Sequence, residues 1–234
     1  MKQSKEKSKN YTIMVWGEYA LFTRPENKVE SVSYPIPTYS AMRNLLQHIY
    51  WHPGISYVVD KIEVMTPIQY ETIKVNEVPV LATKNHLNEP IDIAANRGQR
   101  TKRYLRNVSY RLSFHFTFEV PKEYNNPDPK TVNVQKYQHM LEQALSSGRP
   151  SRDTYFGTRE CTAFFGYLDE YDTLAEPIPE DLDVGFMFYD WDFDNPRIEG
   201  KSTYYNPKYT QIKMAQGVVD YTKIKEGDIH TCLC

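Results

Sequence analysis

A stretch of 15 residues near the middle of the chain, residues 97–111, combines positive charge with aromatic rings and contains no Asp or Glu. Tyr104 and Tyr110 are interleaved with its six cations, which are Arg97, Arg100, Lys102, Arg103, Arg106 and Arg111. Because such cations bind phosphates and tyrosine rings stack on bases, this pattern is typical of a nucleic-acid contact. A solvated loop that leads into a strand with a charged outer face would have the same composition.

Two further groups of residues have the chemistry of a metal site or a disulfide. Asp190, Asp192 and Asp194 alternate along an aromatic run. Alternate strand residues share one face without a loop to wrap a cation, so we expect a solvated acidic face. Cys161, Cys232 and Cys234 cannot all be paired and lack the spacing of a four-ligand zinc site, which predicts reduced thiols. The sequence therefore predicts no metal and no cofactor.

Charge is distributed unevenly along the 234 residues, although the net charge is only −2. Residues 1–160 carry 22 Lys and Arg against 16 Asp and Glu, whereas residues 161–234 carry 6 against 14. The first part is therefore the one suited to a polyanion. Hydrophobic residues make up 40% of the chain and charged residues 25%, with no apolar run near the roughly 18 residues that span a bilayer. We expect a cytoplasmic protein with no membrane partner, and the lysine-rich residues 1–10 are predicted to be a flexible basic tail without a secretory signal.

The first half of the chain alternates strand and helix signals. Residues 11–16 predict a strand, and Thr38 is a plausible N-cap for a helix whose apolar residues repeat every three or four positions until Pro53–Gly54. Residues 56–67 and 68–80 predict two strands. Residues 85–99 are polar and predict a long loop.

The second half repeats the order. Residues 104–120 predict a strand with one apolar face formed by Tyr110, Leu112, Phe114, Phe116 and Phe118. A helix is predicted over 132–147, with Val132, Lys136, His139, Met140 and Gln143 at helical spacing and Gly148 as C-cap. Residues 154–168 predict another strand. The resulting order is that of a ferredoxin-like, split βαβ fold.

The remainder of the chain predicts a second, smaller unit. Residues 169–183 are acidic and rich in proline, and three β-rich runs follow at 184–191, 197–205 and 211–221. We expect an α+β protein with a ferredoxin-like domain over 11–168, a small antiparallel β-sheet domain over 169–225 and a flexible tail over 226–234.

Several segments in the first two thirds of the chain resemble one known family. The longest is residues 15–34 (VWGEYALFTRPENKVESVSY), and the others are 37–38, 49–53, 67–68, 76–78, 97–100, 105–110, Asn133 with Lys136, and 155–161. Together they resemble the fifth CRISPR-associated family, subtype I-C, over roughly residues 11–168. The resemblance implies an RNA-binding fold of the RAMP superfamily, with a ferredoxin-like (RRM-like) N-terminal domain and a small β-sheet C-terminal domain.

The resemblance also implies an activity and partners. Members of this subtype are metal-independent endoribonucleases that cut the repeat of precursor CRISPR RNA beside its stem-loop. They then stay on the 5′ handle, next to the large and backbone subunits of the type I-C interference complex. By resemblance, the catalytic tyrosine falls on Tyr50 and the catalytic lysine on Lys136. The residues that we assign to RNA binding are Arg24, Lys28, Arg43, Arg97, Gln99, Arg100, Lys102, Arg103 and Arg159.

The sequence departs from the family pattern at one position. Many relatives have a histidine directly after the lysine, and this chain has Tyr137. We predict that His139, three residues from Lys136 on a neighbouring part of the same helical face, takes over as the base. His52 is the reserve candidate, and His48, Tyr137 and, more weakly, His115 are alternatives. If none of them serves, the chain is an architectural RNA-binding subunit whose cleavage is slow or absent.

Overall fold

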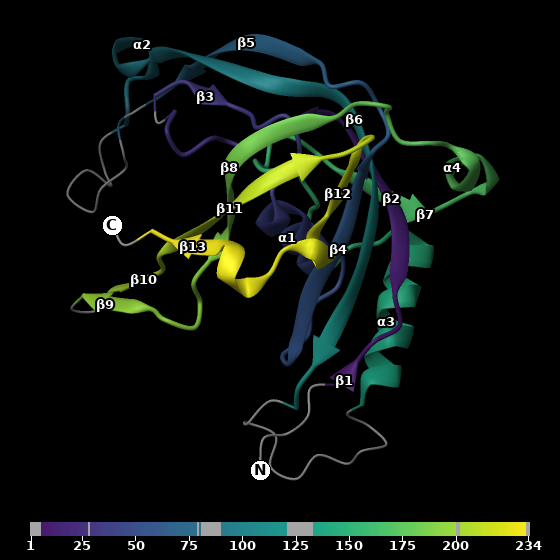
Figure 1. Ribbon diagram of the computed structural model, residues 1–234. Helices are drawn as coiled ribbons and strands as arrows, with labels where there is room; N and C mark the ends of the chain where they lie inside the picture. Colours follow the sequence, from purple (N-terminus) through teal and green to yellow (C-terminus); the bar gives the residue numbers. More distant parts are fainter. Residues whose placement is uncertain are drawn as a thin grey trace.

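The computed structural model describes residues 6–27, 29–78, 80, 90–120, 133–199 and 202–232. Its centre is a sheet with the strand order β12-β4-β6-β2-β7, in which every neighbouring pair is antiparallel (Figure 1). The five strands are β2 (Tyr11–Ala20), β4 (Ile55–Val64), β6 (Gly98–Phe118), β7 (Phe164–Tyr167) and β12 (Val218–Asp220). The structure is therefore a mixed α/β protein built mostly from antiparallel sheet.

Two long helices contribute to the main core. Helix α1 (Tyr39–Ile49) begins at its predicted N-cap, because the Thr38 hydroxyl accepts a hydrogen bond of 3.1 Å from the Ala41 N–H. Helix α3 (Val134–Ser147) ends at the predicted C-cap Gly148, whose φ of +62° is favourable for glycine. Helix α1 ends at Ile49, earlier than the predicted stop at Pro53.

Helix α3 buries a different set of residues from the set whose spacing predicted the helix. Lys136, His139, Met140 and Gln143 are exposed, and Val132 lies outside the described residues. The residues that pack into the core are Val134, Tyr137, Leu141 and Leu145. Both sets have helical spacing, so periodicity alone did not separate them, whereas the greater apolar content of the second set does.

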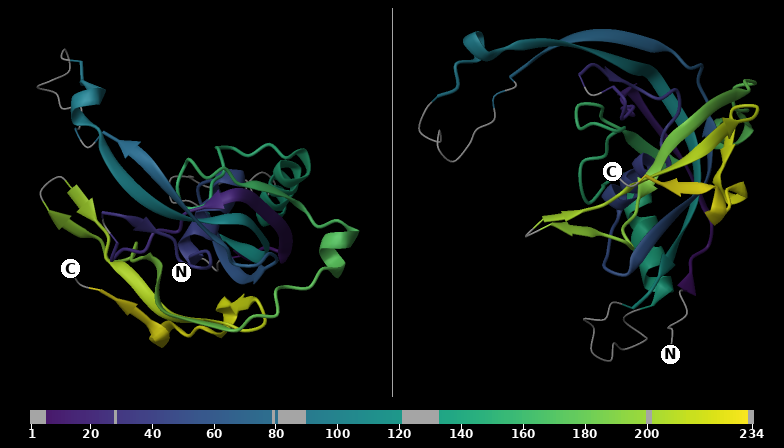
Figure 2. Two further views of the ribbon diagram at one scale, coloured as in Figure 1. Left: turned by 90° about the horizontal axis from the view of Figure 1, so that it is seen from above. Right: turned by 60° about the vertical axis from the view of Figure 1, so that its left-hand side comes forward.

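Strand β6 is the longest described element, with 21 residues. Its predicted apolar face is confirmed, since Tyr110, Leu112, Phe114, Phe116 and Phe118 are all at most 2% exposed. The strand starts at Gly98 because its first residues pair with β5 (Tyr70–Glu77), forming an arm that projects from the body with helix α2 (Ile93–Asn96) at its tip (Figures 1 and 2). The predicted loop over 85–99 is thus wrong for 93–96 and 98–99, and residues 85–89 lie outside the described residues.

Two short strands from the first 32 residues also pair with β6. Strand β1 (Glu6–Lys7) pairs with its end, and β3 (Ser31–Val32) pairs with it in parallel. Ser8 is buried, and its hydroxyl accepts a hydrogen bond of 2.9 Å from the Phe116 N–H. The predicted flexible tail over residues 1–10 is therefore wrong for residues 6–10, of which 6 and 7 form a strand.

The C-terminal part forms a second sheet of three antiparallel strands, which contains parts of two of the three predicted runs. They are β13 (Ile229–Thr231), β11 (Pro207–Met214) and β8 (Leu182–Trp191), with a separate hairpin of β9 (Arg197–Glu199) and β10 (Ser202–Tyr204). Residues 226–231, predicted as a tail, form a 3₁₀ turn, Glu226–Asp228, and β13. Residues 218–220 join the main sheet against β4.

Between α3 and β8, the chain contains little regular structure. The predicted strand over 154–168 is reduced to β7, and residues 155–163 form a loop with one β-bridge between Tyr155 and Thr162. Helix α4 (Glu170–Leu174) follows, capped by Asp169.

The C-terminal sheet packs on α1, where the Tyr39 and Tyr189 rings stack at 4.3 Å. Within the described ranges, no helix has the length and apolar content needed to cross a membrane.

Candidate active site and nucleic-acid interface

Tyr50 is the first residue beyond α1, in extended backbone with φ of −151°. Its N–H donates to the Leu46 carbonyl at 3.1 Å, and its own carbonyl accepts a hydrogen bond of 2.7 Å from the Tyr57 hydroxyl. Burial, together with the neighbouring Tyr137, raises the pKa of Tyr50 to about 12. At neutral pH, Tyr50 is therefore a protonated hydroxyl that can donate a hydrogen bond.

Tyr137 lies where the end of α1 meets the beginning of α3. Its side chain is 2% exposed. The centre of its ring lies 4.5 Å from the centre of the His52 ring and 4.7 Å from the centre of the Phe118 ring. Lys136 is exposed, and its Nζ is 6.0 Å from the centre of the Tyr137 ring. The N-cap Asn133 accepts the Lys136 N–H at 2.8 Å. Tyr50 and His52, which follow α1, are thus spatial neighbours of Tyr137, and Lys136 precedes Tyr137 on α3.

His52 has a defined tautomer in its neutral form. Its Nδ1 lies 2.9 Å from the Pro53 carbonyl oxygen, and because a carbonyl oxygen can only accept, Nδ1 carries the proton. The neutral ring then has its acceptor lone pair on Nε2, which is the form that a general base requires. The half-buried His52 therefore combines the chemistry of a base with a place next to Tyr137.

The other three histidines predicted as bases have different neighbours. His139 is exposed on α3 and acts electrostatically on Glu142, whose pKa is lowered mainly by a hydrogen bond with Lys9. His48 Nδ1 lies 2.6 Å from the Asp153 carbonyl oxygen, and the His48 ring contacts Tyr155. His115 is buried, with Nδ1 at 2.8 Å from Asp60. Of the histidines predicted as bases, His52 is the one with a ring contact to Tyr137.

The acid-free stretch of the sequence lies along the arm of β5 and β6, where acids from other segments approach it. Lys102 Nζ lies 2.8 Å from Glu77 of β5 and 3.2 Å from Glu160, and Arg100 lies 3.3 Å from Glu77. Arg97 and Gln99 are exposed. Arg103 is also exposed, with its guanidinium 4.2 Å above the Tyr70 ring. The arm therefore holds both neutralised and outward-facing cations.

The remaining predicted RNA contacts are scattered. Arg24 lies 4.8 Å above the Tyr34 ring and 3.6 Å from Glu26, and Arg159 is exposed. Arg43 lies 3.0 Å from Asp190 and 5.1 Å from the Phe193 ring, so it links α1 to the C-terminal sheet. Lys28 lies outside the described residues.

The prediction of a solvated acidic face at Asp190, Asp192 and Asp194 is wrong for two of the three residues. Asp190 and Asp192 are 8% and 4% exposed, and the carboxylate of Asp192 lies 3.0 Å from Lys208 Nζ. Pairing with Arg43 and Lys208 explains how these carboxylates tolerate burial. Across the described segments, no three His, Cys, Asp or Glu side chains are grouped as a metal ion would require.

Comparison of the chain with known proteins identifies its family. The family model of CRISPR-associated protein (Cas_Cas5), type Cas5d, matches residues 11–230. The chain belongs to this family. The match extends beyond the segment over 11–168 that the resemblance covered, and it includes the C-terminal sheet.

Two curated Cas5d relatives are similar over most of their length. The CRISPR pre-crRNA endoribonuclease Cas5d of Thermus thermophilus is 32% identical, over 92% of this chain and 88% of that protein. The protein of the same name from Mannheimia succiniciproducens is 29% identical, over 89% of this chain and 92% of that protein. A crystal structure of a CRISPR-associated protein has the same fold, with a TM-score of 0.70 at 21% identity, covering 98% of this chain and 100% of that one.

Proposed function

We propose that this Cas5 chain is a metal-independent endoribonuclease that cuts the repeat of precursor CRISPR RNA. The observation that carries the proposal is the position of His52 and Tyr50 next to Tyr137, the residue that directly follows Lys136 in the first turn of α3. These groups supply a hydroxyl donor, a base and a cation, which are the parts that ribose-driven RNA cleavage needs. The names of the two relatives support the same activity.

The proposed reaction uses the ribose 2′-hydroxyl as nucleophile. His52 Nε2 removes its proton while the bond from the 2′-oxygen to phosphorus forms and the bond to the 5′-oxygen breaks. The departing 5′-oxygen takes up a proton from solvent water, so the products are a 2′,3′-cyclic phosphate and a 5′-hydroxyl. Tyr50 orients the 2′-oxygen, and the charge of Lys136 stabilises the phosphate as its negative charge increases. His52 here replaces His139, the base predicted from the sequence.

The strand order supports a more specific fold assignment. The order β7-β2-β6-β4, with α1 between β2 and β4 and α3 between β6 and β7, is that of a ferredoxin-like domain. We assign residues 11–168 to this RAMP-type domain and residues 169–231 to the smaller β unit, except for β12, which adds a strand to the main sheet beside β4. After cleavage the chain is proposed to stay on the 5′ handle in the cytoplasm, beside the large and backbone subunits of the type I-C interference complex.

A decisive test is single-turnover cleavage of the cognate repeat RNA by the purified full chain in excess chelator. The expected products end in a 2′,3′-cyclic phosphate and a 5′-hydroxyl. Loss of cleavage in chelator that magnesium restores, or a product with a 3′-hydroxyl, would contradict the proposed chemistry.

A second function is favoured by one observation, the burial of Tyr137 at the position where relatives have a catalytic histidine. If His52 does not act, the chain binds the repeat RNA as an architectural subunit and cleaves slowly. Tyr137→His separates the two functions. A large gain in cleavage rate would favour the architectural function, whereas an unchanged or lower rate would favour the nuclease.

A further inference from the structure

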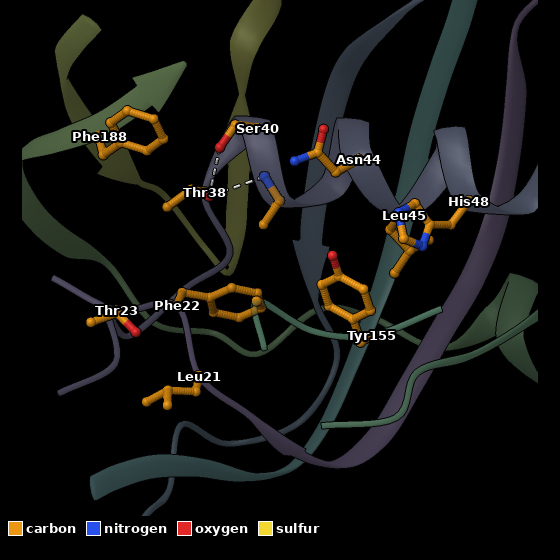
Figure 3. A pocket seen from close by; sticks show the side chains of 12 residues that line it. Leu21, Phe22, Thr23, Thr38, Ser40, Asn44, Leu45, His48, Tyr155 and Phe188 are labelled. Carbon is orange, nitrogen blue, oxygen red and sulfur yellow. Dashed lines mark hydrogen bonds between the residues drawn. The ribbon is translucent and has the colours of Figure 1, made fainter. Parts of the chain in front are cut away.

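A cavity of about 220 Å³ lies beside α1, and no step of the proposed reaction uses it. The residues 21–23 that follow β2, the loop at 155–157 and Phe188 of β8 line its other sides (Figure 3). We propose that this cavity binds one unpaired nucleobase of the RNA. The inference rests on the proposed function, since it takes the ligand to be the same RNA.

The size and the walls of the cavity suit a single flat ring system. Drug-sized ligands occupy cavities of about 300–1,000 Å³, so this cavity suits a smaller group. Phe22, Tyr155 and Phe188 supply aromatic surface around it. Unpaired RNA bases bind in this way, because each base has a π face that stacks on an aromatic side chain.

Polar groups along α1 can pair with the edge of a base. Asn44 is exposed and offers an amide donor and a carbonyl acceptor (Figure 3). His48 Nδ1 donates to the Asp153 carbonyl at 2.6 Å, so the neutral ring has its acceptor on Nε2. The Ser40 hydroxyl lies 3.4 Å from that of Thr38. Donors and acceptors without a lining carboxylate match the edge of a neutral base.

The loop that forms one wall is held in place before any ligand binds. The Leu21 N–H donates to the Phe156 carbonyl at 3.1 Å, and the Phe156 N–H donates to the Cys161 carbonyl at 2.8 Å. Gly157 has φ of +82°, and a Cβ there would lie 2.0 Å from the Leu21 carbonyl oxygen. Only glycine fits this close approach. A wall that is already fixed lowers the entropic cost of binding a base.

The cavity is also close to the candidate active site along one rigid element. Asn44 and Ile49 are five residues apart on α1, which is about 7–8 Å at 1.5 Å per residue, and Tyr50 follows directly. Arg24 directly follows the lining residue Thr23 in the sequence and is a cation that could contact a phosphate of the same RNA. A base in the cavity would therefore belong to a nucleotide near the phosphate that is cut.

The test uses the full chain and a series of repeat RNAs, each lacking the base at one unpaired position. For the wild type, we expect one position at which base removal lowers affinity about 5- to 150-fold, the range for one stacked base. Tyr155→Ala and Asn44→Ala should each weaken binding of the intact RNA. In each variant, removing the base at the sensitive position should then lower affinity less than it does in the wild type. Tyr171→Ala on α4, where the side chain is 79% exposed, is the control and should leave the pattern unchanged.

The outcomes separate the inference from the function on which it rests. If the wild type binds and cuts the RNA but no position is sensitive, or if both variants retain the full positional loss, the cavity does not bind a base. Asn44→Ala keeps this test valid even if Tyr155→Ala disturbs the loop, because alanine is favoured at an exposed helical position. If the wild type does not bind repeat RNA, the proposed function fails and the inference fails with it.

Discussion

The imidazole of His52 lies 4.5 Å, centre to centre, from the ring of Tyr137, with an angle of 36° between the rings. Tyr137, at the position where the resemblance implies a histidine, therefore packs against His52. Because Tyr137 is buried between His52 and Phe118, it fixes the turn after α1 against the first turn of α3. In the proposed mechanism, Tyr137 is thus a positioning residue and His52 supplies the base.

Lys136→Ala and Tyr50→Phe should each slow cleavage far more than they weaken binding. Loss of a positioned catalytic group costs about 10²- to 10⁴-fold in rate, whereas loss of one exposed contact changes affinity about fivefold or less. Single-turnover rates and dissociation constants for repeat RNA check this. Lys213→Ala in β11, with a side chain 68% exposed, is the control. Equal losses of rate and affinity would reassign Tyr50 and Lys136 to RNA recognition.

The dependence of cleavage on pH should identify the base. A histidine base gives a rate that increases through about pH 6 to 7 and then stays level. The pKa of Tyr50 is raised to about 12, so its hydroxyl stays protonated and should cause no loss of rate below about pH 10. His52→Ala should abolish the rise, and His139→Ala should keep it. The opposite pattern would restore His139, the residue predicted from the sequence.

The cations of the arm should differ in their contribution to RNA binding. Arg97 and Arg103 face outward, so replacing either with Ala should lower affinity and reduce the salt slope by just under one per lost phosphate contact. Lys102→Ala should reduce the slope less, because Glu77 and Glu160 already neutralise Lys102. Dissociation constants measured over a range of salt concentrations check this. An identical slope change in all three variants would show that the ion pairs do not matter.

The main sheet should lose stability in acid through Glu63. Burial opposes ionisation of Glu63, but hydrogen bonds from Lys61 and Arg111 outweigh it and hold its pKa below the ordinary 4.5. The stabilisation is therefore complete above about pH 4.5 and is lost as the pH falls through the lowered pKa. Glu63→Gln should reduce the free energy of unfolding at pH 7 by about 3 kcal/mol and flatten its dependence on acid pH. Urea unfolding at several pH values measures both effects.

A matched control for this change is Glu71→Gln on β5. Glu71 pairs with Arg106 at 3.2 Å, and the Arg106 side chain is 51% exposed. The loss at pH 7 should therefore be about 1 kcal/mol or less. If the two variants lose equal stability, burial of the Glu63 pair has no special role.

Local signals predicted much of the fold. The capping groups of Thr38 and Gly148 act within one or two turns of their own helices, and the alternation over 110–118 reports a single buried face. Such features depend on neighbours in sequence, so they can be recognised without knowledge of the tertiary structure.

Features that depend on pairing between distant segments were missed. Residues 97–111 contain no acid, yet Glu77 and Glu160 neutralise Lys102 from another strand and a loop. Asp190 has the appearance of a solvated strand residue, but Arg43 of α1 pairs with it in a buried environment. His52 is separated from Lys136 by 84 positions, and only the contact between α1 and α3 makes it a candidate base.

Strand β6 runs without interruption from the tip of the arm to the candidate active site. Its first residue, Gly98, follows the exposed Arg97 at the tip of the arm, and its last, Phe118, contacts Tyr137 at the candidate active site. At about 3.3 Å per residue, this path is roughly 65 Å long, and hydrogen bonds to β5, β2 and β4 hold it along its length. In the proposed function, an RNA that binds both Arg97 and Lys136 must cover this fixed path, so β6 would set the length of RNA between the two contacts.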